Sequence, residues 1–193
     1  METGSAHAWG RDSDARVAAQ VLGHRHLVLV GLMGAGKSAI GRRLAEALAR
    51  PFADSDTVIE EEAGQTIADM FARDGEEAFR RVEEAVLGRL LEGAPAVIAT
   101  GGGAFLRPTN RARIREAALS VWLRADLDVL VGRIRRPATR PLLAGDDLRD
   151  TLTSLMRKRY PVYAAADVVV DSEDVDRAVT VRRALAAVAA LGA

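Results

Sequence analysis

The sequence predicts a single α/β domain in which helices cover both faces of a five-stranded parallel sheet. Short apolar runs alternate with helical patterns along the chain, and this alternation is typical of parallel strands connected by helices. A glycine-rich turn joins the first apolar run to the first helix. Residues 31–38, Gly-Leu-Met-Gly-Ala-Gly-Lys-Ser, fit the P-loop pattern G-x-x-x-x-G-K-[ST] at every fixed position. Together these observations predict the three-layer α/β/α fold of P-loop NTPases.

Short apolar runs predict the strands. Residues 26–30 precede the P-loop directly, and the run at 96–99 ends in three glycines. Uninterrupted apolar runs are typical of strands that are buried on both faces of a sheet. In chain order, strands are expected at residues 26–30, 51–56, 96–99, 119–123 and 168–170.

Amphipathic patterns predict the helices between these strands. The helix after the P-loop places Ile40 and Leu44 on one face, and a longer helix does the same with Val82 and Val86. Gly75 interrupts the helical pattern that precedes the longer helix. Helices are expected at residues 39–50, 76–91, 125–134, 148–159 and 175–191, with shorter helical pieces between 57 and 75.

The two ends of the chain differ in character. Residues 1–24 are polar and mixed in charge, so we expect a loose, flexible extension with at most a short helix around 15–22. Residues 25–193 are expected to form one domain, because this length is enough to bury a full core. Within it, residues 135–147 are rich in arginine, proline and glycine, which predicts a mobile loop.

Composition narrows the class of function. The 27 basic and 27 acidic side chains give a formal net charge of zero, which argues against nucleic-acid and membrane partners. The absence of cysteine excludes disulfides, thiolate metal sites and cysteine nucleophiles. His7, His24 and His26 all lie at or before the first strand, so a general base elsewhere would be a carboxylate. Without an apolar run that could span a bilayer or form a signal peptide, we expect a monomeric cytoplasmic enzyme.

The P-loop predicts a site for a nucleoside triphosphate. Its glycines let the backbone N–H groups point at phosphate oxygens, and the following helix N-terminus adds partial positive charge. Lys37 and Lys158 are the only lysines of the chain. Lys37 has the position from which a lysine reaches the β- and γ-phosphates, and the Ser38 hydroxyl can ligate Mg²⁺.

Asp54 and Asp56 follow the second predicted strand, at the edge of the sheet that lines the ligand crevice in open parallel folds. Two carboxylates one residue apart on an extended segment point in different directions. One could therefore face Mg²⁺ and the other a substrate hydroxyl. The alternative is that Asp56 merely caps the helix that begins after it, which is a common role of aspartate.

A run of three glycines, Gly101, Gly102 and Gly103, follows the third strand. This run favours a loop that lets a ligand approach the backbone closely over a simple turn. On the preceding helix, Arg80 is three residues before Glu83, so an ion pair could orient it, or it is an ordinary solvated arginine.

Two more arginines allow two interpretations each. Arg140 in the predicted mobile loop fits a lid that closes over the phosphates, or a surface loop with stray charge. Arg159 lies near a predicted helix C-terminus, where the helix dipole alone favours a basic residue.

Taken in order, six segments resemble the shikimate kinase family, and the resemblance covers about residues 27–170. The P-loop alone is generic, whereas the combination with the later segments is specific. The segments are GLMGAGKS at 31–38, DSD at 54–56, IADMFARDGEEAFRRVE at 67–83, GGGAF at 101–105, RPLL at 140–143 and RYPVYAAAD at 159–167.

The resemblance implies a fold like that of the nucleoside monophosphate kinases. It implies a helical substrate-binding region over about residues 56–83 and a lid over about residues 135–147. The implied reaction transfers the γ-phosphoryl group of ATP to the 3-hydroxyl of shikimate. The product, shikimate 3-phosphate, belongs to the biosynthesis of chorismate and the aromatic amino acids.

The resemblance also implies roles by position. Phosphates of ATP would be held by Gly34, Ala35, Gly36, Lys37, Ser38, Ala39 and Arg140, and Mg²⁺ by Ser38 and, through water, Asp54. Shikimate would be bound by Asp56, Arg80, Glu83, Gly101, Gly102, Gly103 and Arg159. Catalysis is assigned to Lys37, Asp54, Asp56 and Arg140, and either Arg133 or Arg136 would lie against adenine.

Two rival functions use the same scaffold. One is a kinase for another small hydroxylated metabolite, such as gluconate. Two arginines directed at a carboxylate argue against a neutral sugar as its substrate. The other rival is a nucleotide-sensing regulator that has lost catalysis, and the presence of Lys37, Asp56 and Arg140 argues against it.

Overall fold

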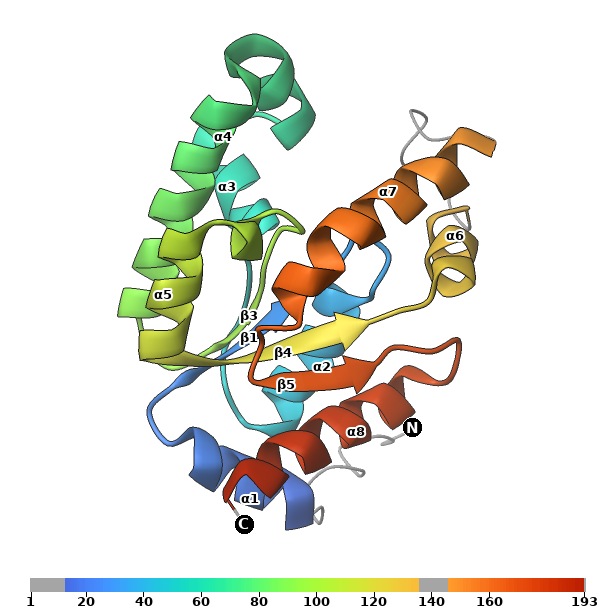
Figure 1. The fold of residues 1–193 in the computed structure, drawn as a ribbon. Helices are drawn as coiled ribbons and strands as arrows, with labels where there is room; N and C mark the ends of the chain where they lie inside the picture. The colour runs from blue at the N-terminus through green and yellow to red at the C-terminus, as the bar shows by residue number, and fades with distance from the viewer. Residues whose placement is uncertain (1–12, 136–145, 193) are drawn as a thin grey trace, which may run out of the picture.

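The strands of the computed structural model are β1 (His26–Val30), β2 (Phe52–Asp54), β3 (Val97–Ala99), β4 (Ala118–Arg124) and β5 (Val168–Asp171). The structure describes residues 13–135 and 146–192, and in these residues the strands form one parallel sheet in the order β2-β3-β1-β4-β5 (Figure 1). All residues of the central strand β1 are buried. Leu27 of β1 pairs with Val97 of β3 on one side and Leu119 of β4 on the other. The predicted parallel α/β fold is confirmed.

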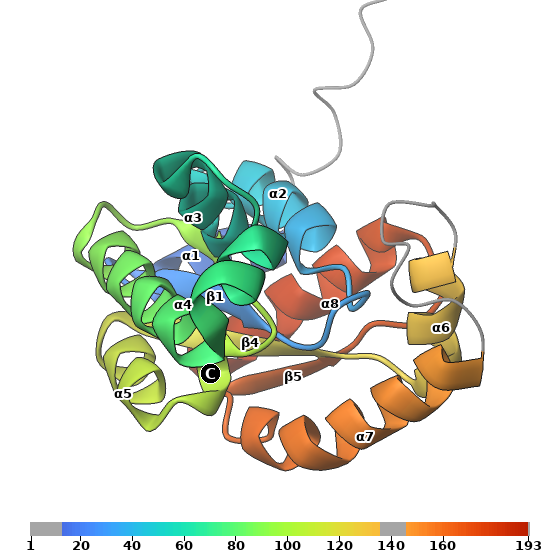
Figure 2. The same cartoon turned by 90° about the horizontal axis from the view of Figure 1, so that it is seen from above.

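Helices lie on both faces of the sheet. The described helices are α1 (Ser13–Leu22), α2 (Lys37–Ala47), α3 (Ser55–Ala63), α4 (Ile67–Glu92), α5 (Pro108–Ala117), α6 (Leu127–Arg135), α7 (Asp146–Tyr163) and α8 (Arg177–Ala189), with short 3₁₀ turns η1 (Ala104–Leu106) and η2 (Ala190–Gly192). Helices α2 and α8 cover one face and α5 and α7 the other (Figures 1 and 2). This arrangement accounts for the strands' apolar sequences, because both faces of the sheet are covered.

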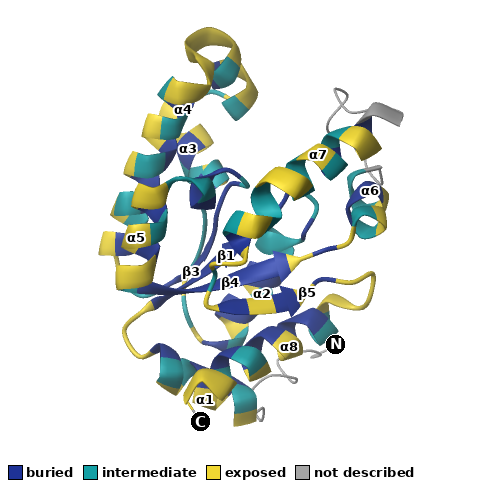
Figure 3. Cartoon of the chain, in the orientation of Figure 1, coloured by how far each residue is buried: buried dark blue, intermediate teal, exposed yellow. Residues whose placement is uncertain are grey.

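The expectation of a loose extension over residues 1–24 is wrong for residues 13–22. These residues form α1, which packs against α8 and buries Ala15, Ala18 and Leu22 (Figure 3). A short helix at this place was the most that we predicted, because the apolar spacing of Ala15, Ala18 and Leu22 does not show what covers it.

The interruption predicted at Gly75 is confirmed, because its φ of 79° and ψ of 172° are non-helical and the two helical segments of α4 meet there at a kink. Two further elements differ from the prediction. Helix α7 does not end at Arg159 but includes Pro161 and extends to Tyr163. Helix α5 was not predicted, because its mostly polar sequence buries only Asn110 and Ile114.

The carboxyl ends of the strands position the site. The P-loop follows β1, α3 begins directly after β2, and residues 101–103 follow β3. Helices α4 and α7 project beyond this edge on either side of it (Figure 1). Residues 136–145, which make up most of the lid predicted at 135–147 and include Arg140, lie outside the described residues, as do residues 1–12. Within the described part of the chain, no helix has the length and apolar character needed to cross a membrane.

Candidate active site

The P-loop wraps around the N-terminus of α2. Gly36 precedes the helix with φ 94°, a left-handed conformation that other residues rarely adopt. Lys37 Nζ donates hydrogen bonds to the carbonyl oxygens of Gly31 (2.8 Å) and Leu32 (3.0 Å), which hold the ammonium group over the loop. This is the arrangement that the sequence pattern predicts for a phosphate cradle.

The first carboxylate of the predicted pair is joined to the P-loop. Ser38 Oγ donates to Asp54 Oδ2 at 2.5 Å, and Asp54 Oδ1 accepts from the backbone N–H of Asp56 at 3.1 Å. Asp54 is therefore the N-cap of α3, and Asp56 lies in the first turn of the helix. The alternative in which Asp56 is the cap is wrong. Ser38 and Asp54 form a pair of oxygen groups of the kind that Mg²⁺ prefers.

Charged side chains crowd against the three glycines after β3. A Cβ at Gly101 would lie only 2.6 Å from Asp56 Oδ1 and 2.8 Å from Glu83 Oε1. A Cβ at Gly103 would overlap the guanidinium group of Arg80. The loop thus brings α3 and α4 together at one point. That a ligand approaches its backbone stays a prediction.

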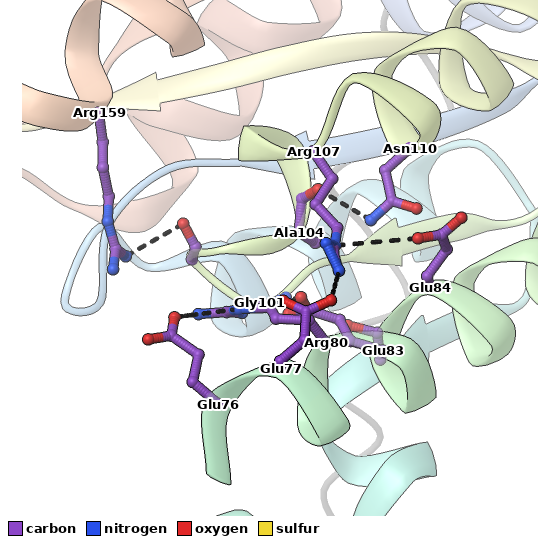
Figure 4. A network of polar contacts seen from close by, with 12 residues as sticks. Glu76, Glu77, Arg80, Glu83, Glu84, Gly101, Ala104, Arg107, Asn110 and Arg159 are labelled. Atoms are coloured by element: carbon purple, nitrogen blue, oxygen red, sulfur yellow. Dashed lines mark hydrogen bonds and ion pairs between the residues drawn. The ribbon is translucent and has the colours of Figure 1, made fainter. Parts of the chain in front are cut away.

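Arg80 comes from α4 and is held on both sides (Figure 4). Its Nη1 donates to Glu83 Oε2 at 2.8 Å and its Nη2 to Glu76 Oε1 at 3.1 Å. The guanidinium carbon lies 5.8 Å and 5.3 Å from the ring centroids of Phe71 and Phe79. Arg80 is therefore an oriented side chain rather than a solvated one, as the Glu83 spacing allowed.

Glu83 is the most deeply buried acid of this group, with only 1% of its surface exposed. Burial raises the pKa of Glu83, and the adjacent Arg80 guanidinium opposes that rise. Among the described residues, Glu83 Oε1 has no hydrogen-bond partner, although a buried acceptor is normally satisfied. This oxygen lies on the Gly101 side, next to Asp56, where a ligand hydroxyl could donate to it.

Arg159 approaches from α7 on the opposite side (Figure 4). Its Nη1 donates to the carbonyl oxygen of Gly102 at 3.1 Å. A Cβ on Gly102 would lie 3.5 Å from the Gly31 carbonyl oxygen, so the glycine loop also lies against the P-loop. The structure thus brings together the predicted residues of the P-loop, Asp54, Asp56, Arg80, Glu83, the glycine loop and Arg159.

Of the two adenine candidates, Arg133 is described and Arg136 is not. Arg133 Nη1 donates to Ser172 Oγ at 2.9 Å and to the Gly34 and Ala35 carbonyl oxygens at 3.3 Å. Arg133 therefore supports the P-loop from α6.

Sequence reasoning missed three hydroxyl groups that support the loops. Ser55 Oγ accepts from the Gly101 N–H at 3.1 Å, Ser172 Oγ donates to the Ala35 carbonyl oxygen at 2.8 Å, and the Tyr163 hydroxyl donates to the Gly102 carbonyl oxygen. Ser55 and Tyr163 stood inside segments that the sequence singled out, but nothing in either segment indicated which backbone group they meet.

Comparison with known proteins agrees with this geometry. The family model described as shikimate kinase matches residues 33–189. A shikimate kinase of Rhizobium meliloti is 51% identical over 91% of this chain and 91% of its own length. The structure of a shikimate kinase from Acinetobacter baumannii, solved in complex with shikimate, has a TM-score of 0.79 at 34% identity and covers 86% of this chain and 94% of its own.

A protein with one of the rival functions is also among the similar structures. A gluconokinase from Sinorhizobium meliloti has a TM-score of 0.56 at 24% identity, covering 86% of this chain and 93% of its own, and this similarity shows the fold alone. The family match and the relative at 51% identity show more than the fold. The chain therefore belongs to the shikimate kinase family.

Proposed function

We propose that the chain transfers the γ-phosphoryl group of ATP to the 3-hydroxyl of shikimate, with the P-loop as donor site and the residues around Gly101–Gly103 as acceptor site. The observation that carries the proposal is the environment of the glycine loop. The loop lies against the P-loop at Gly31, and its other sides contact two acids, Asp56 and Glu83, and two arginines, Arg80 and Arg159. A substrate with one carboxylate and several hydroxyls matches that set. The guanidinium groups of the arginines can donate paired hydrogen bonds to the substrate carboxylate, and the carboxylate oxygens of the acids can accept hydrogen bonds from the substrate hydroxyls.

On the acceptor side, Asp56 would accept the proton of the 3-hydroxyl. The oxygen of that hydroxyl then forms a bond to the γ-phosphorus as the bond to the β-phosphate oxygen breaks, giving shikimate 3-phosphate and ADP. Arg80 and Arg159 would orient the shikimate carboxylate, and the unpartnered Glu83 Oε1 would accept from a ring hydroxyl. Holding the two reactants in line in this way supplies much of phosphoryl-transfer catalysis.

On the donor side, Lys37 would stabilise negative charge on the β- and γ-phosphate oxygens. Mg²⁺ would be held by Ser38 directly and by Asp54 through water, and when bound it would neutralise charge on the same oxygens. The donor set fits the ion, since Ser38 Oγ and Asp54 Oδ2 are already 2.5 Å apart beside the P-loop. We propose that the enzyme is a monomer, because Asp56, Arg80 and Arg159 already meet at the glycine loop without a group from a second copy, and that it acts in the cytoplasm, where ATP is available.

The test is a coupled assay of ADP formation with purified enzyme and Mg²⁺. We expect ADP release to depend on shikimate, and the product to carry one phosphate on its 3-oxygen by ³¹P NMR. Gluconate and the carboxamide of shikimate serve as alternative acceptors and should react at least about 10²-fold less efficiently. The carboxamide lacks the negative charge that the two arginines bind, and gluconate, an open chain, does not hold its carboxylate and hydroxyls in the fixed arrangement of the shikimate ring. Equal turnover of gluconate and shikimate would overturn the assignment.

A further inference from the structure

Tyr163 is buried completely, with 0% of its surface exposed, at the end of α7. It follows Arg159 by four residues, so both side chains lie on the same face of the helix. The Tyr163 hydroxyl donates to the carbonyl oxygen of Gly102, and Arg159 Nη1 donates to that same oxygen. One backbone carbonyl of the glycine loop is therefore held by two side chains of α7.

Packing alone does not account for a phenol at this place. The Tyr163 ring lies 5.9 Å from the Trp122 ring and 6.2 Å from the Tyr160 ring between centroids, contacts that a phenylalanine would also make. A buried hydroxyl costs free energy unless it is hydrogen-bonded. What the hydroxyl adds to the ring is the bond to Gly102 and a side-chain interaction with Arg159 itself.

The position of Gly102 matters to every group around it. Its two neighbours in the loop, Gly101 and Gly103, pack against the carboxylates of Asp56 and Glu83 and against the Arg80 guanidinium. A small rotation of the Gly102 peptide would move both neighbours and remove the acceptor that orients Arg159. Positioning of this kind affects catalysis because small displacements of reacting groups are costly.

We propose that Tyr163 is a positioning residue for the acceptor site, which fixes the Gly102 carbonyl and, through it, the Arg159 guanidinium. The inference rests on the proposed binding of the acceptor carboxylate by Arg159. Tyr163 itself touches no reacting atom. Burial raises the pKa of Tyr163 to about 12, so its hydroxyl keeps its proton at neutral and moderately alkaline pH.

The test compares Tyr163→Phe with Tyr160→Phe. Both changes remove one hydroxyl from the same helix, and the Tyr160 hydroxyl donates to the Ala125 carbonyl oxygen instead. We expect Tyr163→Phe to raise the KM for shikimate about three- to tenfold, the effect of losing one hydrogen bond, at all pH values from 6 to 9. The KM for ATP should stay within about twofold, and Tyr160→Phe should leave the KM for shikimate unchanged.

A purely structural hydroxyl would give a different result. It would lower the melting temperature of Tyr163→Phe while the KM for shikimate stays within twofold of wild type, and this result would overturn the inference. The inference would also be overturned if Tyr163→Phe raised the KM for ATP as much as the KM for shikimate, or if Tyr160→Phe raised the KM for shikimate to the same extent. Stabilisation of the folded protein by shikimate, measured as the shift in melting temperature, gives a second readout that needs no turnover.

A double-mutant cycle separates this inference from the proposed function. If Tyr163 acts through Arg159, the effect of Tyr163→Phe on the KM for shikimate should fall below about twofold in an Arg159→Lys background. Full additivity would overturn the link to Arg159. An Arg159→Lys enzyme with normal KM for shikimate would instead overturn the carboxylate role of Arg159. If Arg159→Lys raises the KM for shikimate and Tyr163→Phe does not, the positioning role of Tyr163 is overturned while the carboxylate role of Arg159 stands.

Discussion

At the scale of single residues, the carboxylate of Asp56 is the proposed proton acceptor. Because Asp54 supplies the N-cap of α3, the carboxylate of Asp56 is not needed as the cap, and one of its oxygens lies beside Gly101 and Glu83. We expect Asp56→Asn to lower kcat by about 10²-fold or more while ATP still binds, because the hydroxyl loses its proton acceptor. The measurement is steady-state turnover together with nucleotide titration.

The control for Asp56 is Asp69→Asn. Asp69 is also an aspartate in the first turn of a helix, but it is exposed and pairs with Thr66. It tests whether the loss of a negative charge near a helix N-terminus is enough to lower activity. If both variants turn over normally and only unfold more readily, Asp56 has no part in the chemistry.

Arg80 can be tested against its neighbour Arg81, which lies on the same helix and serves as the control. Arg80 is held by Glu76 and Glu83, whereas Arg81 is exposed. Arg80→Ala should lower kcat/KM for shikimate roughly 30- to 1000-fold, because truncation leaves buried Glu83 and the substrate carboxylate uncompensated. Arg81→Ala should change it less than about twofold.

The carboxamide of shikimate shows whether Arg80 contacts the carboxylate. Replacing the carboxylate by an amide should penalise the wild type strongly and the Arg80→Ala enzyme much less, because the interaction is already lost. Equal penalties in the two enzymes would mean that Arg80 binds another group. ATP affinity should be unaffected in either case.

At the scale of elements, His26 connects β1 with the end of α4 and with the loop before β3. It lies buried at the start of β1, accepts from the Ala96 N–H through Nδ1 at 3.1 Å, and therefore donates from Nε2 to the Leu91 carbonyl oxygen at 3.1 Å. Burial lowers the pKa of His26 below its usual 6.5, with Arg50 contributing in the same direction. The native state thus requires the neutral ring, since a protonated Nδ1 could not accept from Ala96.

The sign of the pH effect follows from this lowered pKa. Near pH 6 the unfolded chain binds a proton at His26 that the folded chain does not, so stability falls as the pH drops below about 6.5. The free energy of unfolding should fall by up to about 1.4 kcal/mol per pH unit because of His26, until the pH reaches the pKa of His26 in the folded state. Urea unfolding between pH 8 and pH 5 measures it. His26→Gln should flatten the profile and exposed His24→Gln should not, and identical profiles would refute the assignment.

At the scale of the whole molecule, α1 belongs to the folded domain. Leu22 is 1% exposed in the α1–α8 contact, while Val17 on the same helix is 40% exposed. We expect Leu22→Ala to lower the free energy of unfolding by about 2–4 kcal/mol and Val17→Ala by less than about 1 kcal/mol. Both should keep normal kcat and KM values, because α1 packs on α8 and not on the site. Lost turnover in folded Leu22→Ala would show that α1 also shapes the site.

Much of the fold could be predicted from the sequence because its signals are local. The P-loop spacing, the apolar strands and the order of strands and helices each lie within a few consecutive residues, and all five strands were found. The sequence pattern also singled out Lys37, Asp56 and the three glycines, and their functional roles stay predictions. The role of Arg80 was not evident from its own helix, since solvated arginines share the same pattern, and it rested on the resemblance to the family.

Only the tertiary structure decided which groups meet. The sequence did not show that Asp54 rather than Asp56 caps α3, that the glycine loop is tight because Asp56, Glu83 and Arg80 crowd it, or that Tyr163 shares a carbonyl with Arg159. Nor did it show that residues 13–22 pack against α8 at the other end of the chain. The physical reason is the same in each case. Hydrogen bonding and burial depend on neighbours that are distant along the chain, whereas the patterns in a sequence report only on neighbours that are close.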